Sequence, residues 1–391
     1  HSSNKVTPSS SVTVSNLLNI SDGILAAPAS DFDDVTIGAN GNLEISGNIT
    51  VSGDWNDGGS FTPSTNTVTF DGSSAQSITS GGSVFYSVTI SNTSSTVSIA
   101  DKFEFSSGTL TINSSAVFAL AGYEFDDNGR TITNNGTFQM NGDETLTTGA
   151  LSIPGNTKIV DGSGATLTTG LAGLVNVEFN STGQTFVLGE ALSYVTGNLT
   201  IASNTTLDVS SSNNYAIFVG GDWSNNGTFT SRSGTVTFSG SDSQAMSGTT
   251  SFYNLTINNT HGSNKVTPGS AITVTNVLNV NDGILATPAS DYDDVTIGSN
   301  GTLELTGNIT VSGDWSDAGL LTPSTNTVTF DGSSAQSITS NGSVFHTVTI
   351  SNTSAAVSIA DKFEFATGTL TINSSAIFAL AGNEFDDNGA T

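Results

Sequence analysis

Short stretches in which apolar residues alternate with threonine or serine recur along the whole chain, as in TLTI at residues 109–112. This two-residue period is typical of a β-strand with one buried face, because successive side chains of a strand point to opposite sides. No segment keeps the 3.6-residue period of an amphipathic helix, so the pattern predicts an all-β protein. The predicted strands are centred near Val68, Val88, Leu110, Ile132, Ile153, Val175 and Leu199.

The spacing of these strands favours a parallel β-helix, or β-solenoid. One strand position returns about every 20 to 24 residues, with Gly, Asn, Asp and Ser turns between. At about 22 residues per turn and about 4.8 Å between turns, the chain would form about 18 turns. The alternative is a row of β-sandwich domains of about 90 residues, because Trp223 and Trp315 are 92 residues apart. The 168 residues between Trp55 and Trp223, and the lack of linkers, argue against sandwiches.

A long internal repeat organises the chain. Residues 1–131 return at 261–391, and about 103 of these 131 positions are identical. We therefore divide the sequence into a first copy (1–130), a continuation that completes the 260-residue repeat (131–260), and a second, truncated copy (261–391). Because the second copy stops within the pattern, we expect the natural protein to continue in both directions.

A shorter motif begins with Gly-Asp-Trp and occurs three times, at Trp55, Trp223 and Trp315. A TVTF strand follows each time, and a glutamine comes 21 residues after each tryptophan. These glutamines are Gln76, Gln244 and Gln336. We interpret the tryptophan as a core or corner residue and the glutamine as the partner of buried backbone groups. The alternative is a carbohydrate-binding platform.

Residues 221–260, GDWSNNGTFTSRSGTVTFSGSDSQAMSGTTSFYNLTINNT, resemble the repeats of large secreted, adhesin-like surface proteins of bacteria and archaea. The likeness is strong over about 40 residues at three places and looser over the rest of the chain. It implies a cell-surface β-helical stalk or matrix component. It implies no enzyme, because the shared positions are strand, turn and core residues.

Charge and composition exclude several functions. The formal net charge is −27 at pH 7, and the seven basic residues stand singly. Such a chain repels phosphate and anionic lipid, so nucleic acid and membrane surfaces are not expected partners. No apolar run reaches the roughly 20 residues that cross a bilayer, which argues against membrane insertion. The chain has no cysteine, so burial and hydrogen bonding must hold it together.

Acidic clusters are the candidates for a metal site. Three carboxylates within four residues can supply the oxygen ligands that Ca²⁺ prefers, so calcium is the candidate cofactor. The candidate ligands are Asp31, Asp33 and Asp34 and their copies Asp291, Asp293 and Asp294. A second acidic group contains Glu124, Asp126, Asp127 and Asn128 and returns as Glu384, Asp386, Asp387 and Asn388. Neither spacing matches an EF-hand or a nonapeptide calcium repeat, and the alternative is a solvated turn.

The pattern does not favour an enzyme. Polysaccharide-degrading β-helices pair carboxylates with basic or nucleophilic groups in a cleft. Here the nearest basic residues are Lys102 and Lys362, each within Asp-Lys-Phe-Glu-Phe, where we expect the lysine to offset its acidic neighbours on a solvent face. An ice-binding face is also disfavoured, because the Thr-x-Thr elements vary in spacing.

Together these patterns predict a structural protein, secreted or on the cell surface, that forms a rigid rod, filament or matrix component by adding turns. The expected partners are other copies of the chain, by self-association or stacking. The alternative function is that of an adhesin, whose partners would be surface glycans. In that case exposed aromatic residues such as Tyr86 and Tyr253 would line a groove.

Overall fold

The computed structural model describes residues 4–147, 153–160, 163–167, 174–260, 263–365 and 367–388. Within these ranges every regular element is a β-strand and none is a helix, and every strand pairing is parallel. The predicted β-solenoid is therefore confirmed, with about 18 turns in all. The alternative of tandem β-sandwiches is wrong, because the strands of such domains pair in antiparallel sheets.

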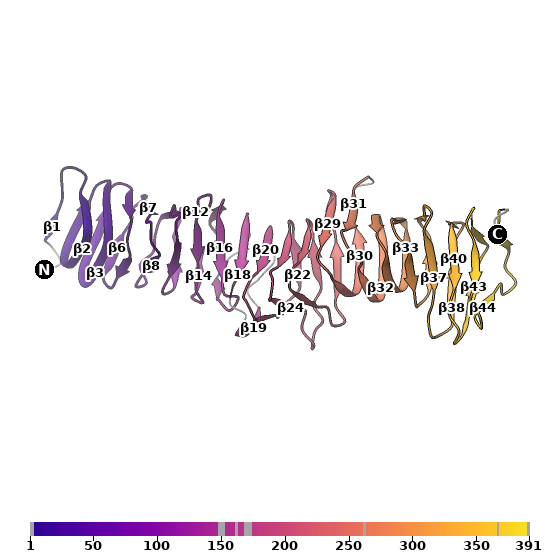
Figure 1. Ribbon diagram of the computed structural model, residues 1–391. Coiled ribbons are helices and arrows are strands. Elements are labelled where there is room, and N and C mark those ends of the chain that lie inside the picture. Colours follow the sequence, from indigo (N-terminus) through magenta and orange to yellow (C-terminus); the bar gives the residue numbers. More distant parts are fainter. Residues whose placement is uncertain are drawn as a thin grey trace. The chain divides into compact units, whose positions relative to one another are not determined.

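The chain forms two compact units, His1–Phe186 and Val187–Thr391. This division differs from the repeat boundaries that the sequence predicts after residues 130 and 260. Within each unit, successive strands of one face lie beside one another like the rungs of a ladder (Figure 1).

In unit 1 the strands are β1 (Lys5–Val6), β2 (Thr13–Ala27), β3 (Ser30–Ile45), β4 (Ile49–Val51), β5 (Trp55–Asp57), β6 (Ser60–Thr62), β7 (Thr67–Phe70), β8 (Gln76–Thr79), β9 (Ser87–Ile90), β10 (Thr96–Ile99), β11 (Phe103–Glu104), β12 (Thr109–Ile112), β13 (Val117–Ala119), β14 (Phe125–Asp126), β15 (Thr131–Asn134), β16 (Thr137–Met140), β17 (Leu146–Thr147), β18 (Asn156–Ile159), β19 (Ser163–Leu167) and β20 (Asn176–Phe179). The next strand is β21 (Thr185–Leu188), which contains the boundary between the units.

In unit 2 the strands are β22 (Leu192–Val195), β23 (Leu199–Ile201), β24 (Thr206–Asp208), β25 (Ile217–Val219), β26 (Trp223–Asn225), β27 (Thr228–Thr230), β28 (Thr235–Phe238), β29 (Gln244–Ser247), β30 (Ser251–Asn258), β31 (Lys265–Pro268), β32 (Thr273–Thr287), β33 (Ser290–Leu305), β34 (Ile309–Val311), β35 (Trp315–Asp317), β36 (Leu320–Thr322), β37 (Thr327–Phe330), β38 (Gln336–Thr339), β39 (Val344–Phe345), β40 (Thr347–Ile350), β41 (Ala356–Ile359), β42 (Phe363–Phe365), β43 (Leu370–Ile372), β44 (Ile377–Ala379) and β45 (Phe385–Asp386).

Each turn of the solenoid has three faces, as the pairing of the long strand β3 demonstrates. The beginning of β3 pairs with β4, its middle with β5 and its end with β6. Later turns divide the same path into three short strands, such as β12, β13 and β14. The corners between the faces bring backbones close together: a side chain at Gly59 would place its Cβ 2.2 Å from the carbonyl oxygen of Gly38. Glycine is therefore required there, because any larger residue would collide with the preceding turn.

The strand register confirms most of the spacing that the sequence predicts. Val88 faces Val68 on one side and Leu110 on the other, and Leu110 faces Ile132. The strands predicted near Ile153 and Val175 are present but displaced, because β18 begins at Asn156 and β20 at Asn176. Ile153 is followed by a proline, which has no backbone N–H to donate to a ladder.

Columns of aromatic rings run through the interior parallel to the solenoid axis. In unit 1, Phe103 stacks against Phe85 with 5.2 Å between ring centroids and against Phe125 with 6.2 Å. The second copy repeats this column with distances of 5.1 and 6.2 Å. All three rings in unit 1 are 0% exposed. Register between turns thus places identical residues over one another, so that aromatic rings contact each other from turn to turn inside the core.

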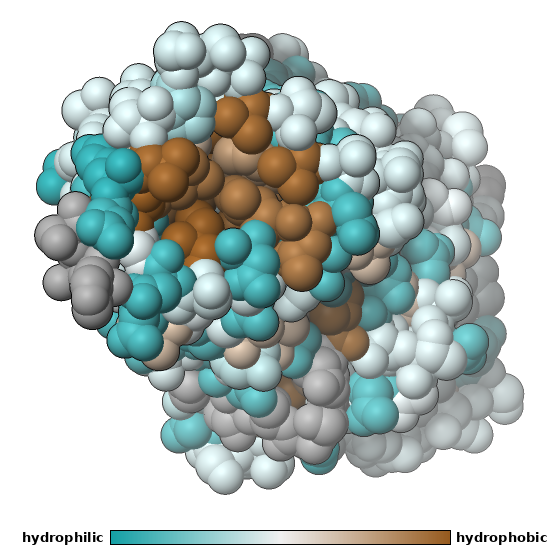
Figure 2. Space-filling view, turned by 90° about the vertical axis from the view of Figure 1, so that its left-hand side faces the viewer, coloured by the Kyte–Doolittle hydropathy of each residue, from teal (hydrophilic) through white to brown (hydrophobic). Residues whose placement is uncertain are grey.

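Apolar side chains are exposed at the end of unit 1 that carries β1, where Figure 2 shows a brown apolar area bordered by hydrophilic residues. Val6 of β1 and Leu17 of β2 are 64% and 46% exposed. The last turn of unit 2 has a similar surface, where Ile372 is 49% and Ile377 58% exposed.

Candidate functional site

The first two predicted calcium ligands bond to hydroxyl groups of the following turn. Asp31 is exposed on β3, and its Oδ1 accepts a hydrogen bond from Thr50 Oγ1 at 2.5 Å. Asp33 Oδ1 accepts one from Ser52 Oγ at 3.1 Å. Both carboxylates therefore join one turn to the next along the surface.

The third predicted ligand, Asp34, accepts a hydrogen bond from the backbone N–H of Asp54 at 2.8 Å. It lies with Asp33 at a corner, where a Cβ on Gly53 would come within 2.1 Å of Asp34 Oδ1 and 2.9 Å of Asp33 Oδ1. Asp54 in turn accepts from the N–H of Ser77 at 2.8 Å, so the carboxylates continue from turn to turn. In the second copy the same bonds are made by Asp291, Asp293, Asp294 and Asp314.

In the part of the chain that the structure describes, no group of three or more His, Cys, Asp or Glu side chains is arranged to hold a metal ion. Each predicted ligand has one carboxylate oxygen bonded to the neighbouring turn, which explains these aspartates without a cation. Calcium stays a prediction. Its test is thermal unfolding with added Ca²⁺ and with chelator, where an unchanged midpoint would remove the proposal.

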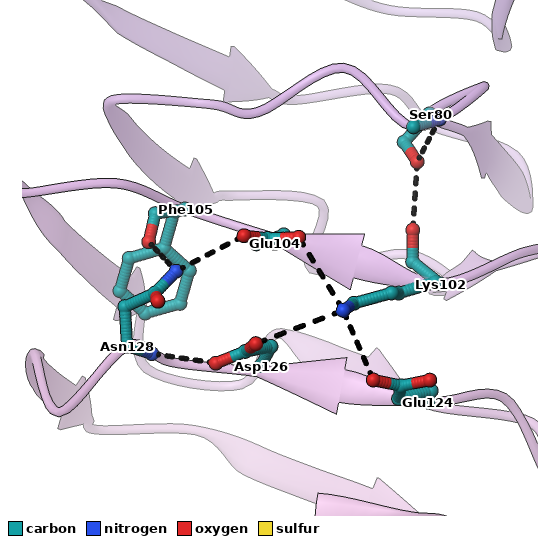
Figure 3. A network of polar contacts seen from close by, with 8 residues as sticks. Ser80, Lys102, Glu104, Phe105, Glu124, Asp126 and Asn128 are labelled. Carbon is teal, nitrogen blue, oxygen red and sulfur yellow. Dashed lines mark hydrogen bonds and ion pairs between the residues drawn. The ribbon is translucent and has the colours of Figure 1, made fainter. Parts of the chain in front are cut away.

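The second acidic group forms an ion-pair network around Lys102 (Figure 3). Lys102 Nζ lies 3.0 Å from Glu124 Oε1, 3.5 Å from Glu104 Oε2 and 3.7 Å from Asp126 Oδ2. Glu104 of β11 stands directly opposite Asp126 of β14, so two like charges meet across the ladder and the ammonium group offsets their repulsion. The hydrogen bond to Glu124 is the main reason why the pKa of Lys102 is raised.

Asn128 completes this network from the following turn. Its Nδ2 donates to Glu104 Oε1 at 3.3 Å and to the carbonyl oxygen of Phe105 at 3.0 Å. The second copy builds the same ion-pair network around Lys362, whose partners are Glu364, Glu384 and Asp386. The prediction that these lysines offset acidic neighbours is therefore confirmed.

The three tryptophans of the Gly-Asp-Trp motif are core residues. Each is 1% exposed, and Trp55 packs edge-on against Phe61 with 4.8 Å between ring centroids. The interpretation as a carbohydrate-binding platform is wrong, because a buried ring cannot stack on a sugar.

The motif glutamines form a buried clamp, as the sequence predicts. Gln76 Nε2 donates to the carbonyl oxygens of Val51 at 2.9 Å and Gly53 at 2.7 Å. Gln76 Oε1 accepts from Gly72 N at 2.9 Å and from Asn92 Nδ2 at 3.1 Å. Both donors and both acceptor positions of the amide are thereby used inside the solenoid. Gln244 and Gln336 make the corresponding four bonds.

The sequence-based reading missed the asparagine of this clamp. Asn92 is 1% exposed, and its Nδ2 also donates to the carbonyl oxygen of Ser74 at 2.6 Å. Its Oδ1 accepts from the backbone N–H groups of Ser94 and Ser95. The corresponding residues of the other two clamps are Asn259 and Asn352. Each of the three asparagines comes two residues after a Thr-Ile pair that ends a strand sequence, in TISN or TINN. That recurrence is the signal that could have found it.

The buried position two residues after the motif tryptophan carries a carboxylate in two of the clamp turns and an amide in the third. Asp57 is 2% exposed, its Oδ1 accepts from Gly59 N at 2.8 Å, and burial is the main cause that raises its pKa. Asp317 has the same surroundings in the second copy, and its pKa is also raised by burial. The third turn has Asn225 instead, whose Nδ2 donates to Thr250 Oγ1 at 3.2 Å.

A surface groove in unit 2 is a candidate for binding a small molecule. Its most prominent side chain is Phe218, which is 37% exposed. The other lining residues are Ser193, Val195, Thr196, Gly220, Ser239, Gly240, Ser241 and Asp242. An exposed ring beside hydroxyl and carboxylate groups suits a sugar, whose faces are apolar and whose edges carry hydroxyl groups. Tyr86 and Tyr253, which the sequence suggests for such a role, are half-buried elsewhere.

Among the described residues, no helix has the length and apolarity of a membrane span. Comparisons with protein-family models, with curated proteins and with solved structures gave no match.

Proposed function

We propose that this chain is a structural, non-catalytic protein that acts outside the cell or on its surface as a solenoid spacer, filament or matrix component. One observation carries this proposal: the polar side chains that recur in both copies bond one turn to the next. The Gln76 clamp, the Asp34 bond to Asp54 and the Lys102 network all do so. Their second-copy equivalents repeat this arrangement.

The mechanism is mechanical. Interior turns of the described residues, such as the one that contains β12, form backbone hydrogen bonds with the turns on both sides and bury apolar residues between them. In such repeat architectures stability is roughly the sum of turn energies and of contacts between neighbours, so length can grow by duplication. The net charge of −27 keeps neighbouring molecules apart unless cations or specific contacts join them. Self-association is the partner prediction that follows.

The proposed location is supported by composition and by the resemblance of residues 221–260 to surface-protein repeats. An antibody against this segment should label intact cells of the source organism without permeabilisation. Labelling that appears only after permeabilisation would contradict the extracellular role. Electron microscopy of the purified chain tests the mechanical part: stiff particles of uniform length are expected, and flexible beads would contradict it.

Glycan binding at the Phe218 groove is a second candidate function, favoured by the exposed ring among hydroxyl groups. A glycan array probed with the purified chain should give signals that Phe218→Ala removes. Tyr123→Ala is the matched control, because Tyr123 is 43% exposed in unit 1 and should leave binding unchanged. An array without signal, or equal signals from the chain and Phe218→Ala, would remove this candidate.

A further inference from the structure

One face of unit 1 carries threonine at nearly every outward position. Strands β7, β9, β12 and β15 have the sequences TVTF, SVTI, TLTI and TITN. The second and fourth residues of each strand are buried, so the first and third point outward and are half-buried or exposed. These eight outward side chains, which we call the threonine face, are Thr67, Thr69, Ser87, Thr89, Thr109, Thr111, Thr131 and Thr133.

The strand register aligns the threonine face in two columns. Column A contains the third residue of each strand, in the order Thr69, Thr89, Thr111 and Thr133. Column B contains the first residue of each strand, in the order Thr67, Ser87, Thr109 and Thr131. Neighbouring turns are about 4.8 Å apart and alternate residues of one strand about 6.6 Å apart. The hydroxyl and methyl groups therefore form a two-dimensional lattice.

The spacing of the Thr-x-Thr elements along the sequence conceals this lattice. It changes from 20 residues between positions 67 and 87 to 22 residues between positions 87 and 109, which argues against a regular array when only the sequence is considered. In the structure the variation lies in the loops between the faces, because the four strands pair without a register shift. The argument from sequence spacing against an ice-binding face therefore does not hold for these strands.

The threonine face carries no charged side chain, although the net charge of the chain is −27. Within the described residues, no hydrogen bond joins a hydroxyl group of column A to another protein group. Thr50 of the preceding turn differs, because its hydroxyl group donates to Asp31. The hydroxyl groups of column A are therefore available to water, each with a methyl group beside it.

Strand propensity alone does not explain this composition. Threonine favours strands on any face of a solenoid. The neighbouring face of the same turns nevertheless carries mixed outward side chains, such as Ser98 of β10, Val117 of β13 and Gln139 of β16. The TVTF strand β28 lacks the array as well, because Thr237 faces Phe218. Threonine is therefore concentrated on one face of particular turns.

Unit 2 repeats the array at β37 and β40. Thr327 faces Thr347, and Thr329 faces Thr349. Thr347 stands where the first copy has Ser87, so all four outward residues of these two strands are threonine. The arrangement is thus present in both copies of the long repeat.

We propose that the threonine face binds ice. Water molecules at the surface of an ice crystal form a regular lattice whose repeat distances are similar to those between the turns and between the columns. Methyl groups restrict the orientations of neighbouring water, and hydroxyl groups hold ordered water by hydrogen bonds. A charged group would keep its own hydration shell, so the absence of charge on this face suits the same role. This activity goes beyond the proposed structural role and does not depend on it.

Partitioning into ice tests the proposal. A seeded ice crystal grows slowly through a dilute solution of the complete chain and a fluorescent marker protein that ice excludes. The chain should be enriched in the ice relative to the marker, because binding to the growing surface incorporates it. Exclusion of the chain to the same extent as the marker would overturn the proposal.

Two double variants show whether the threonine face is responsible. Thr89→Lys with Thr349→Lys places an ammonium group in the array of each copy and should reduce enrichment to the level of the marker. Ser98→Lys with Ser358→Lys is the matched control, because these serines are half-buried on β10 and β41 and the change in net charge is the same. The control should be enriched like the natural chain, and equal enrichment of the two double variants would overturn the proposal.

Thermal melting must give the same midpoint for the two double variants, so that a loss of enrichment reflects the surface and not unfolding. If Thr89→Lys with Thr349→Lys melts earlier, Thr69→Lys with Thr329→Lys replaces it, since it changes the same face at the adjacent turn. This variant should lose enrichment in the same way, and full enrichment would overturn the proposal.

A second copy of the chain is the alternative occupant, because two acidic chains repel each other least where their surfaces carry no charge. Sedimentation of the chain without ice distinguishes the two. Self-association that Thr89→Lys with Thr349→Lys abolishes, together with exclusion from ice, would assign the face to a contact between copies and would overturn the proposal. A monomer that is enriched in ice would support it.

Discussion

The turn at residues 109–126 and its copy at 369–386 have nearly the same sequence but different surroundings. In unit 1 the interior residues of this turn are 0% exposed, because β15 and β16 cover them. In unit 2, Ile372 and Leu380, the copies of Ile112 and Leu120, are 49% and 42% exposed. Burial of a solenoid residue therefore depends on the neighbouring turn that covers it. Its own strand determines only whether its side chain points toward the core or toward solvent.

The largest effect is expected from removing a ring that is covered in one copy and half-exposed in the other. Phe118 packs against Phe103, Phe125 and Phe138. Its copy Phe378 packs against Phe363 and Phe385 but has no counterpart of Phe138 over it and is half-buried. Phe118→Ala should lower the free energy of opening its turn by about 3–5 kcal/mol, and Phe378→Ala by only about 1–2 kcal/mol. Native-state hydrogen exchange measures both. Equal losses would contradict the role of the neighbouring turn.

The glutamine clamps should respond equally, because turns on both sides cover Gln76 and Gln336 in their respective units. Replacing either by alanine removes four buried hydrogen bonds, although the Val51 and Val311 carbonyls still accept a backbone N–H and the clamp asparagine still donates to a serine carbonyl. We expect a loss of about 2–4 kcal/mol for each variant. Urea unfolding of the two variants tests this, and a large loss for only one of them would show that the two clamps are not equivalent.

A smaller effect of opposite sign is expected at Asp57, where the third clamp turn carries Asn225. Asp57→Asn should stabilise the protein by about 1 kcal/mol at pH 7, because a buried carboxylate is replaced by a neutral amide that can donate. Burial raises the pKa of Asp57, so the folded state binds the proton more tightly than the unfolded state. Stability contributed by this carboxyl therefore rises as the pH falls through its raised pKa.

The advantage of Asp57→Asn over the natural sequence should accordingly shrink between pH 7 and about pH 4, where unfolded carboxyls begin to protonate. Thermal melting across this pH range measures the difference. Asp317→Asn is the matched variant in the second copy and should behave in the same way. A constant difference at all pH values would contradict the assignment to the buried carboxyl.

The smallest effect is expected at Lys102, because surface ion pairs contribute little and are screened by salt. Lys102→Met should lower the melting temperature slightly, and the difference should decrease in high salt. The hydrogen bond to Glu124 raises the pKa of this lysine, so its contribution is present below about pH 10.4 and is lost as the pH rises through the raised pKa. Lys362→Met tests the same network on the last turn of unit 2, and a salt-independent loss would contradict the ion-pair explanation.

Much of the fold could be predicted because its signals are local. Alternation in segments such as residues 109–112 gives the strands and their buried side, and the constant distance from Trp55 to Gln76 gives the clamp. The candidate site could be predicted only in part. Asp31, Asp33 and Asp34 lie together on β3 as expected, but their bonding to the next turn depends on which residues that turn places opposite them.

The parallel β-solenoid could be predicted from the amino-acid sequence alone. Both of its signals, the two-residue period of the strands and the spacing of about two dozen residues between equivalent strands, can be identified along the chain without knowledge of contacts between turns. Tertiary structure alone decided that Asn92 completes the glutamine clamp and that Phe218 lies in a groove. The physical reason is that contacts between turns depend on the exact number of residues in every turn, and one residue more or less changes each partner.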